Sequence, residues 1–112
     1  MNDDIKNAEM ILDKAGRIYD NVFLNATRGL LEIKKGNEEE GRRLYNLAAL
    51  IAGSGKLAKE VDQKKNLELA KYYLKNKQID MAINHFDKVL SVKIDNSIYS
   101  RQAKEFLSVI ND

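Results

Sequence analysis

Few side chains in this 112-residue sequence have the types and spacing that enzyme catalysis or metal binding requires. Cysteine is absent, which excludes thiolate catalysis, disulfides and every metal site that uses cysteine. His85 is the single histidine, and the nearby Asp87 and Lys88 do not complete a set of metal ligands. We therefore expect His85 to be a packing or solvent-edge residue, and we expect no metal, no cofactor and no enzyme activity.

Two short motifs also have residue types that could form a chemical site. Glu38, Glu39 and Glu40 could hold a metal or transfer protons, but carboxylates are equally favoured in the first turn of a helix. They follow Asn37, so we predict a helix start in which Asn37 and Glu40 form a capping box. Residues 53–56, Gly-Ser-Gly-Lys, lack the leading glycine and the following hydroxyl residue of a phosphate-binding loop. We interpret them as a glycine-rich turn.

A basic cluster supports the main alternative function. Its lysines are interleaved with tyrosines, a composition that suits contact with nucleic-acid phosphates and bases. The cluster consists of Lys64, Lys65, Lys71, Tyr72, Tyr73, Lys75 and Lys77. Acidic residues interrupt it and the net charge is only +2, whereas phosphate-driven affinity needs a concentrated positive stripe. A nucleic-acid-associated regulatory helical bundle is therefore the alternative, and nucleic acid is the less favoured partner.

The elements that position these residues are predicted to be helices. Proline is absent, and no stretch alternates apolar and polar residues as a half-buried strand does. We predict one all-α domain over residues 1–112, with about five or six helices. An acidic start and a longest apolar run over residues 47–52 indicate neither a signal peptide nor a membrane span. We expect a soluble, cytoplasmic protein without a membrane partner.

The first stretch predicts an amphipathic helix, because apolar residues recur at alternating spacings of three and four from Ile5 to Ile33. Asp20-Asn21 is its least apolar pair, and asparagine is a good helix N-cap, so we expect a break there. Residues 4–19 would then fold back as a separate helix. In the alternative, the helix is unbroken and its apolar stripe pairs with a second copy in a homodimer.

Later helix boundaries follow from glycines and polar turn residues. Turns are predicted at Gly36, residues 52–55, residues 76–78 and residues 95–97. The domain is accordingly divided into an N-terminal helix (1–21), two helical hairpins (22–55 and 56–96) and a terminal helix (97–112).

Residues 63–96 resemble a tetratricopeptide repeat (TPR), because small, aromatic and apolar residues follow the order of that family. The resemblance is carried by Leu69, Ala70, Tyr73, Ile79, Ala82, Phe86, Val89 and Leu90. A weaker copy over residues 22–55 is carried by Gly29, Gly36, Gly41, Tyr45, Ala48 and Ala49. The family's tryptophan position holds Asn25 or Asn66, and the copies lie further apart than the family's period. Close helix packing needs small residues beside aromatic ones, so Ala82 and Phe86 should be buried.

The TPR resemblance implies both an arrangement and a function. It implies antiparallel hairpins, a capping helix over residues 97–112, and a groove lined by the first helix of each hairpin. In that groove a non-enzymatic protein-binding module, such as an adaptor, scaffold or small chaperone, would bind a peptide or helix, with an acidic segment as one option. The implied groove residues are Ala26, Leu30, Ile33, Lys34, Lys64, Leu67, Lys71, Leu74 and Lys75.

One activity of the family is not implied for this sequence, and a second fold is open to it. Ala26 and Leu30 stand where the family's clamp for chaperone C-terminal carboxylates has Lys and Asn, so that activity is not implied. An unrelated helical bundle is the alternative fold, and core packing is then the role of the groove candidates.

Overall fold

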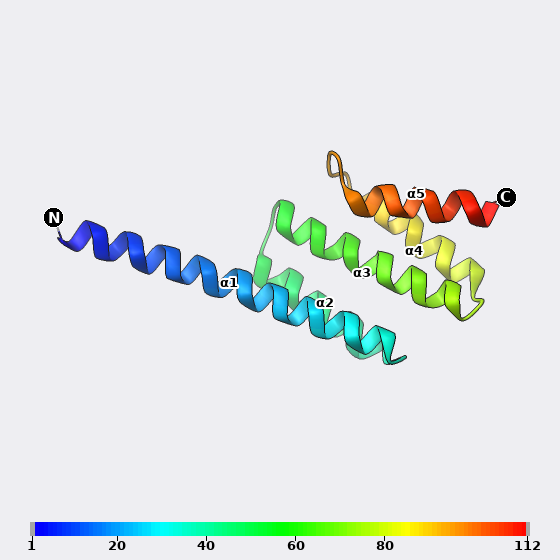
Figure 1. Ribbon diagram of the computed structural model, residues 1–112, viewed down its shortest axis with the longest axis horizontal. Coiled ribbons are helices and arrows are strands. Elements are labelled where there is room, and N and C mark those ends of the chain that lie inside the picture. Colours follow the sequence, from blue (N-terminus) through cyan, green and yellow to red (C-terminus); the bar gives the residue numbers. More distant parts are fainter. Residues whose placement is uncertain (1, 112) are drawn as a thin grey trace.

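A computed structural model describes the backbone of residues 2–111 and the side chains of residues 16–111 (Figure 1). Over this range it contains helices and no strand, which confirms the predicted all-α class. The helices are α1 (Asn2–Lys34), α2 (Glu38–Ala52), α3 (Lys56–Lys75), α4 (Ile79–Ser91) and α5 (Ile98–Asn111). The turns between them lie where glycines and polar residues predicted them.

The predicted break at Asp20-Asn21 is wrong, because α1 is one continuous helix of 33 residues. Asn21 lies inside the helix, where its backbone carbonyl accepts a hydrogen bond of 2.9 Å from Asn25 Nδ2. Without a proline, one polar pair is too weak a signal to interrupt a long apolar stripe. Residues 4–19 therefore do not fold back, and the first half of α1 projects from the other helices (Figure 1). The molecule is 64 Å long as a result.

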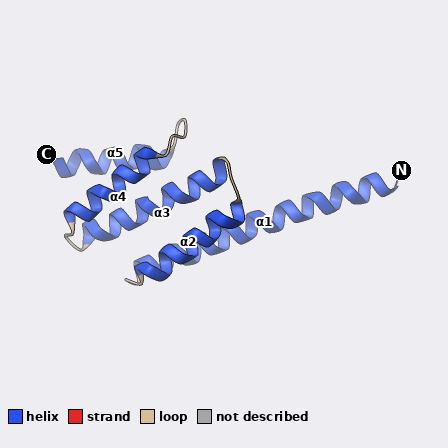
Figure 2. Ribbon diagram, turned by 180° about the vertical axis from the view of Figure 1, so that it is seen from behind, coloured by secondary structure: helices blue, strands red, loops and turns tan. Residues whose placement is uncertain are grey.

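Consecutive helices run in opposite directions and pack side by side, as Figures 1 and 2 show. The second half of α1 packs against α2, and α3 packs against α4. α3 also contacts α1 and α2, while α5 lies on α4 and α3 at the C-terminal end. The odd-numbered helices α1, α3 and α5 thus run in one general direction, with α2 and α4 returning between them.

Two glycines explain the close contact between α1 and α2. A Cβ atom added to Gly29 would lie 2.8 Å from Tyr45 Cδ2, and one added to Gly41 would lie 2.9 Å from the Gly29 carbonyl oxygen. Any larger residue at either position would force the helices apart. In the α3–α4 pair, the small residues Ala70 and Ala82 are fully buried.

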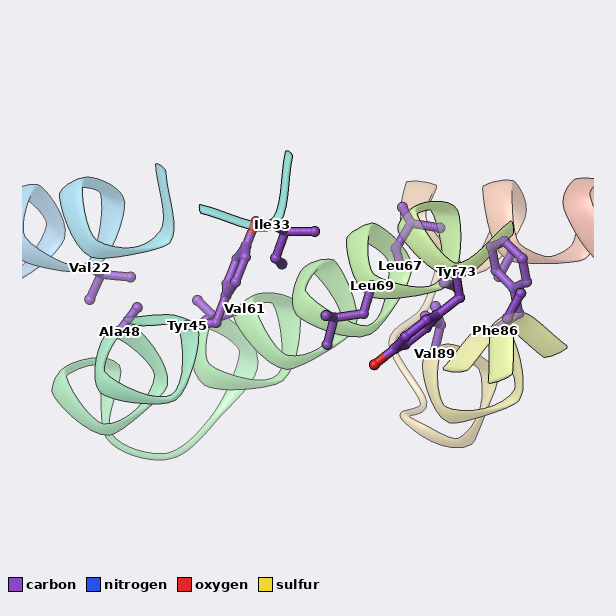
Figure 3. Packing of buried hydrophobic residues seen from close by; sticks show 13 residues of the cluster. Val22, Ile33, Tyr45, Ala48, Val61, Leu67, Leu69, Tyr73, Phe86 and Val89 are labelled. Atoms are coloured by element: carbon purple, nitrogen blue, oxygen red, sulfur yellow. The ribbon is translucent and has the colours of Figure 1, made fainter. Parts of the chain in front are cut away.

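One core joins the two helix pairs (Figure 3). Val22, Ile33 and Tyr45 lie at one end of it, and Phe86 and Val89 lie at the other, with the buried side chains of α3 between them. Phe86 is fully buried, and its ring stacks on Phe106 of α5 with 5.1 Å between the centroids. The predicted burial of Ala82 and Phe86 is confirmed.

Gln63 connects the α4–α5 segment to the core through hydrogen bonds. Its buried Nε2 donates hydrogen bonds to the carbonyl oxygens of Val89 (2.9 Å) and Val92 (2.8 Å), at the end of α4. Its Oε1 accepts a 2.6 Å hydrogen bond from the Ser97 hydroxyl, just before α5 begins. A single buried amide thus links α3 to the end of α4 and to the α4–α5 connection.

The predicted capping box at the start of α2 is not formed. Asn37 makes no side-chain cap hydrogen bond; its Nδ2 donates instead to Glu32 Oε2 at 2.9 Å. Glu40 pairs with Arg43, with 2.6 Å between Oε1 and Nη2. Glu40 therefore stabilises the helix through a neighbour one turn later rather than through the backbone of Asn37.

Candidate functional site

An apolar groove of about 550 Å³ is bounded by α1, α3 and α5. Its wall on α1 is formed by Tyr19, Asp20, Val22, Phe23, Ala26, Thr27 and Leu30. Leu57, Glu60, Val61 and Lys64 of α3 face that wall, Tyr99 of α5 closes the end, and Tyr45 of α2 contributes to the lining. We refer to these residues as the α1–α3–α5 groove.

Aromatic side chains are exposed along the α1 wall. Phe23 is 75% and Tyr19 is 61% accessible, while Val22 of the same wall is buried in the core. Tyr45 is also buried, and burial raises the pKa of its hydroxyl, with smaller contributions from Glu68 and Tyr99. Exposed aromatic side chains thus lie beside buried apolar ones. Such a combination is typical of a binding surface.

Three charged residues line the groove: Asp20, Glu60 and Lys64. The Lys64 ammonium lies 2.8 Å from Glu68 Oε1 and 5.6 Å from the centre of the Tyr99 ring. Burial alone would raise the pKa of Glu68, but the hydrogen bond and charge of Lys64, aided by Lys71, lower it. Lys64 and Glu68 therefore form an ion pair at the edge of the groove.

Only part of the groove predicted from the sequence coincides with this one. Ala26, Leu30 and Lys64 line the α1–α3–α5 groove. Ile33 and Leu67 are 1% and 0% accessible and belong to the core, the packing role that was the alternative for these candidates. Their helical spacing could not distinguish a groove-facing residue from one that faces a neighbouring helix.

The other four candidates lie outside the groove lining. Lys34 and Lys75 are exposed at the ends of α1 and α3. Leu74 is half-buried against the core. Lys71 is half-exposed and lies 3.2 Å from Glu68. The structure therefore places the groove nearer the start of α3 than the sequence pattern suggested.

Several groove residues were not among the candidates. Tyr19, Val22 and Phe23 belong to the apolar stripe of the first helix, so extending the groove toward its N-terminus would have included them. Leu57 and Val61 are four residues apart, which places them on one face of α3. Tyr99 gave no sequence signal of this role, because its place at the groove depends on how α5 docks.

His85 belongs to a polar network that joins α2, α3 and α4. Its Nδ1 lies 2.8 Å from the Met81 carbonyl oxygen, and its Nε2 lies 3.1 Å from Arg42 Nη2. A carbonyl accepts and a guanidinium donates, so the ring is neutral with its proton on Nδ1. Arg42 also donates to the Tyr73 hydroxyl at 2.7 Å, and that hydroxyl donates to Glu38 Oε2.

This network links three helices through buried and half-buried side chains, and its geometry indicates a role in packing. His85 is 3% accessible, so it is a packing residue, one of its two predicted roles. Burial raises the pKa of the Tyr73 hydroxyl, and the hydrogen bond to Glu38 adds to that effect. Among residues whose side chains are described, no group of three or more His, Cys, Asp or Glu could hold a metal ion.

Acidic neighbours pair with part of the basic cluster. Lys64 and Lys71 both contact Glu68, and Lys65 lies 3.1 Å from both Asp62 Oδ1 and Asn46 Oδ1. Three of the lysines that suggested nucleic-acid binding therefore carry carboxylate partners, which reduces the positive potential of this surface.

Comparison with known proteins leaves the chain without a family assignment. No family model, curated protein or solved structure matches it. None of the described helices is both long enough and apolar enough to cross a membrane.

Proposed function

We propose that this chain is a non-enzymatic protein-interaction module that binds an amphipathic helix in the α1–α3–α5 groove. The observation that carries the proposal is the groove itself, about 550 Å³ in volume and lined mainly by apolar residues. Phe23 is 75% accessible within it, and contiguous apolar surface of this kind usually marks an interaction site. An adaptor or scaffold role in the cytoplasm is the corresponding cellular proposal.

The proposed architecture is a pair of TPR-like hairpins, α1–α2 and α3–α4, with α5 as the cap. Support comes from small residues: Gly29 and Gly41 lie at the close contact of one pair, and Ala70 and Ala82 are fully buried in the other. In such an arrangement the first helix of each pair and the cap share one face, which is where α1, α3 and α5 form the groove.

The chemistry of the groove favours apolar anchors in the partner. Asp20 and Glu60 contribute two carboxylates and Lys64 contributes one ammonium group that already contacts Glu68. An acidic partner would gain little attraction from two carboxylates and one paired ammonium group. The proposed partner is therefore not an acidic segment. A helix with apolar residues at every third or fourth position would place them against Phe23, Leu57 and Val61.

The nucleic-acid alternative has weaker support. It depends on the lysines of residues 64–77, and three of them have acidic neighbours within 3.2 Å. Binding of this type would weaken steeply as salt is raised. Salt-insensitive binding of a helix to the groove would separate the two functions.

Site-specific photo-crosslinking tests the proposed function. A benzoylphenylalanine residue is introduced at Phe23 in the groove and, as a matched control, at the neighbouring Leu24, which is 47% accessible but is not part of the groove lining. After irradiation in a lysate of the source cells, mass spectrometry identifies the crosslinked peptide. We expect the Phe23 probe to capture a segment with apolar residues at helical spacing, and the Leu24 probe not to capture it.

Two outcomes would contradict the proposal. Equal capture by the Phe23 and Leu24 probes would show that this surface binds proteins non-specifically. Captured segments without helical apolar spacing would show that the groove does not bind an amphipathic helix.

A further inference from the structure

The apolar stripe of α1 extends beyond the groove that it lines. Leu30, Phe23 and Tyr19 face the groove, and Gly16 lies one turn before Tyr19 on the same stripe. In the sequence the same spacing continues through Leu12 to Ile5. The projecting half of α1 thus carries an amphipathic pattern of the kind that the groove is proposed to bind.

The projecting segment also contains a glycine, Gly16, that no described contact explains. Glycine weakens the interior of a helix, and at Gly29 the close contact with α2 explains it. At Gly16 no such contact exists, because nothing described lies within 4 Å of an added Cβ. A close approach by another chain would give Gly16 the role that Gly29 has within this one.

The groove of the same chain is out of reach for this segment. α1 is continuous from Asn2 to Lys34, so residues 5–16 extend away from the groove that residues 19–30 line (Figure 1). Both segments are about 17 Å long as helices. They could cover each other only if two copies of α1 ran antiparallel.

In one antiparallel register of two α1 helices, a small residue of one copy lies opposite a large residue of the other. With the two-fold axis near residues 17–18, Gly16 faces Tyr19 of the second copy and Leu12 faces its Phe23. Two helical turns further along, Ile5 faces Leu30. The smallest residue thus meets an exposed aromatic ring, and the aliphatic residues meet the remaining apolar wall, as antiparallel helices require for close packing.

We propose that the α1–α3–α5 groove is filled by residues 5–16 of a second copy, and that the exchange is reciprocal, giving a two-fold symmetric dimer. This inference rests on the proposed function, because it uses the same groove and names the helix that occupies it. Each copy contributes one helix and one groove, so the contact surface is used twice. A helix from another protein would have to displace the second copy.

Sedimentation equilibrium with a charge swap tests the dimer. We expect the wild-type chain to be dimeric at micromolar concentration. Leu12→Glu and Phe23→Lys should each raise the dissociation constant about tenfold or more. An equimolar mixture of the two variants should recover a heterodimer, because one interface is then wild-type and the other pairs Glu with Lys. Leu24→Lys is the matched control and should dimerise like the wild type.

Gly16→Gln provides a test that does not depend on a weakened fold. Glutamine favours helix more than glycine does, and the described surroundings of Gly16 leave space for it. We expect circular dichroism to show unchanged or higher helicity while dimerisation weakens about tenfold or more.

The outcomes separate this inference from the proposed function. A wild-type chain that is monomeric up to roughly 100 micromolar would overturn the dimer. So would variants of Leu12 and Phe23 that dimerise normally, or a mixture that fails to recover the heterodimer. If a monomeric chain still crosslinks from Phe23 to an amphipathic helix of another protein, the dimer is wrong and the proposed function stands. Crosslinks from Phe23 to residues 5–16 of a second copy would support the dimer directly.

Discussion

At the scale of single residues, His85 gives the protein a dependence on pH. Burial lowers the pKa of His85 below its usual value of 6.5; the hydrogen bond to the Met81 carbonyl opposes this effect, and the charges of Lys88 and Arg42 add to it. The unfolded chain therefore binds this proton more readily than the folded chain. Stability from the neutral ring is fully present above the usual value and is lost as pH falls from there through the folded-state pKa.

We expect the free energy of unfolding to fall as the pH is lowered through and below the usual histidine value of 6.5, because of His85. One proton limits the slope to about 1.4 kcal/mol per pH unit. Urea denaturation at several pH values measures it, with His85→Gln as the control that removes the titrating ring but keeps polar atoms near Arg42. A wild-type slope equal to that of His85→Gln would contradict the assignment.

A second prediction compares the same substitution at a buried and an exposed phenylalanine. Phe86 is 0% and Phe23 is 75% accessible. Phe86→Ala should lower the free energy of unfolding by about 3–5 kcal/mol, because it leaves a cavity beside Phe106. Phe23→Ala should change it by less than about 0.5 kcal/mol while weakening binding at the groove. Denaturant unfolding of both variants at low protein concentration would show whether this division holds.

At the scale of helices, the same substitution at two glycines of α1 distinguishes the effect of packing from the effect of helix propensity. Gly29→Ala improves propensity but places a methyl group 2.8 Å from Tyr45 Cδ2, so we expect a net loss of about 1–3 kcal/mol. Gly16→Ala meets no described atom within 4 Å and should not destabilise the helix. Denaturant unfolding and hydrogen exchange of α1 measure the two effects. Comparable behaviour of both variants would mean that the α1–α2 contact is looser than the structure shows.

The same contact shows why α1 and α2 form a pair. Gly29 and Gly41 remove side chains where the backbones approach, and Tyr45 fills the space beside them. α3 then joins both pairs, because its buried residues extend from Val61 to Tyr73 along one core (Figure 3).

At the scale of the whole molecule, the first half of α1 is separate from the folded body. No other described helix lies beside it (Figure 1), and the described core begins at Val22. We expect removal of residues 1–15 to change the free energy of unfolding of the dilute monomer by less than about 1 kcal/mol. The truncated chain should also lose self-association.

Urea denaturation and sedimentation equilibrium test this truncation together. A truncated chain that unfolds at much lower urea would show that residues 1–15 contribute to the core. A truncated chain that still dimerises would place the contact elsewhere.

Local features of the sequence were sufficient for the helical class and for most turns. Glycine, asparagine, aspartate and serine at residues 36, 53–55, 76 and 95–97 end or begin helices for reasons that depend only on the neighbouring backbone. The burial of Ala82 and Phe86 followed from the spacing of small and aromatic residues. These features are local or periodic, so they can be recognised without knowing where the other helices lie.

Long-range packing was needed for the remaining features. Whether α1 breaks at Asp20-Asn21, whether Ile33 faces the core or a groove, and which residues surround His85 depend on helices far away in the sequence. Tyr99 reaches the groove only because Gln63 and Phe106 dock α5 against α3 and α4. An amphipathic pattern shows that a face is buried, but the partner that buries it is chosen by the packing of all five helices.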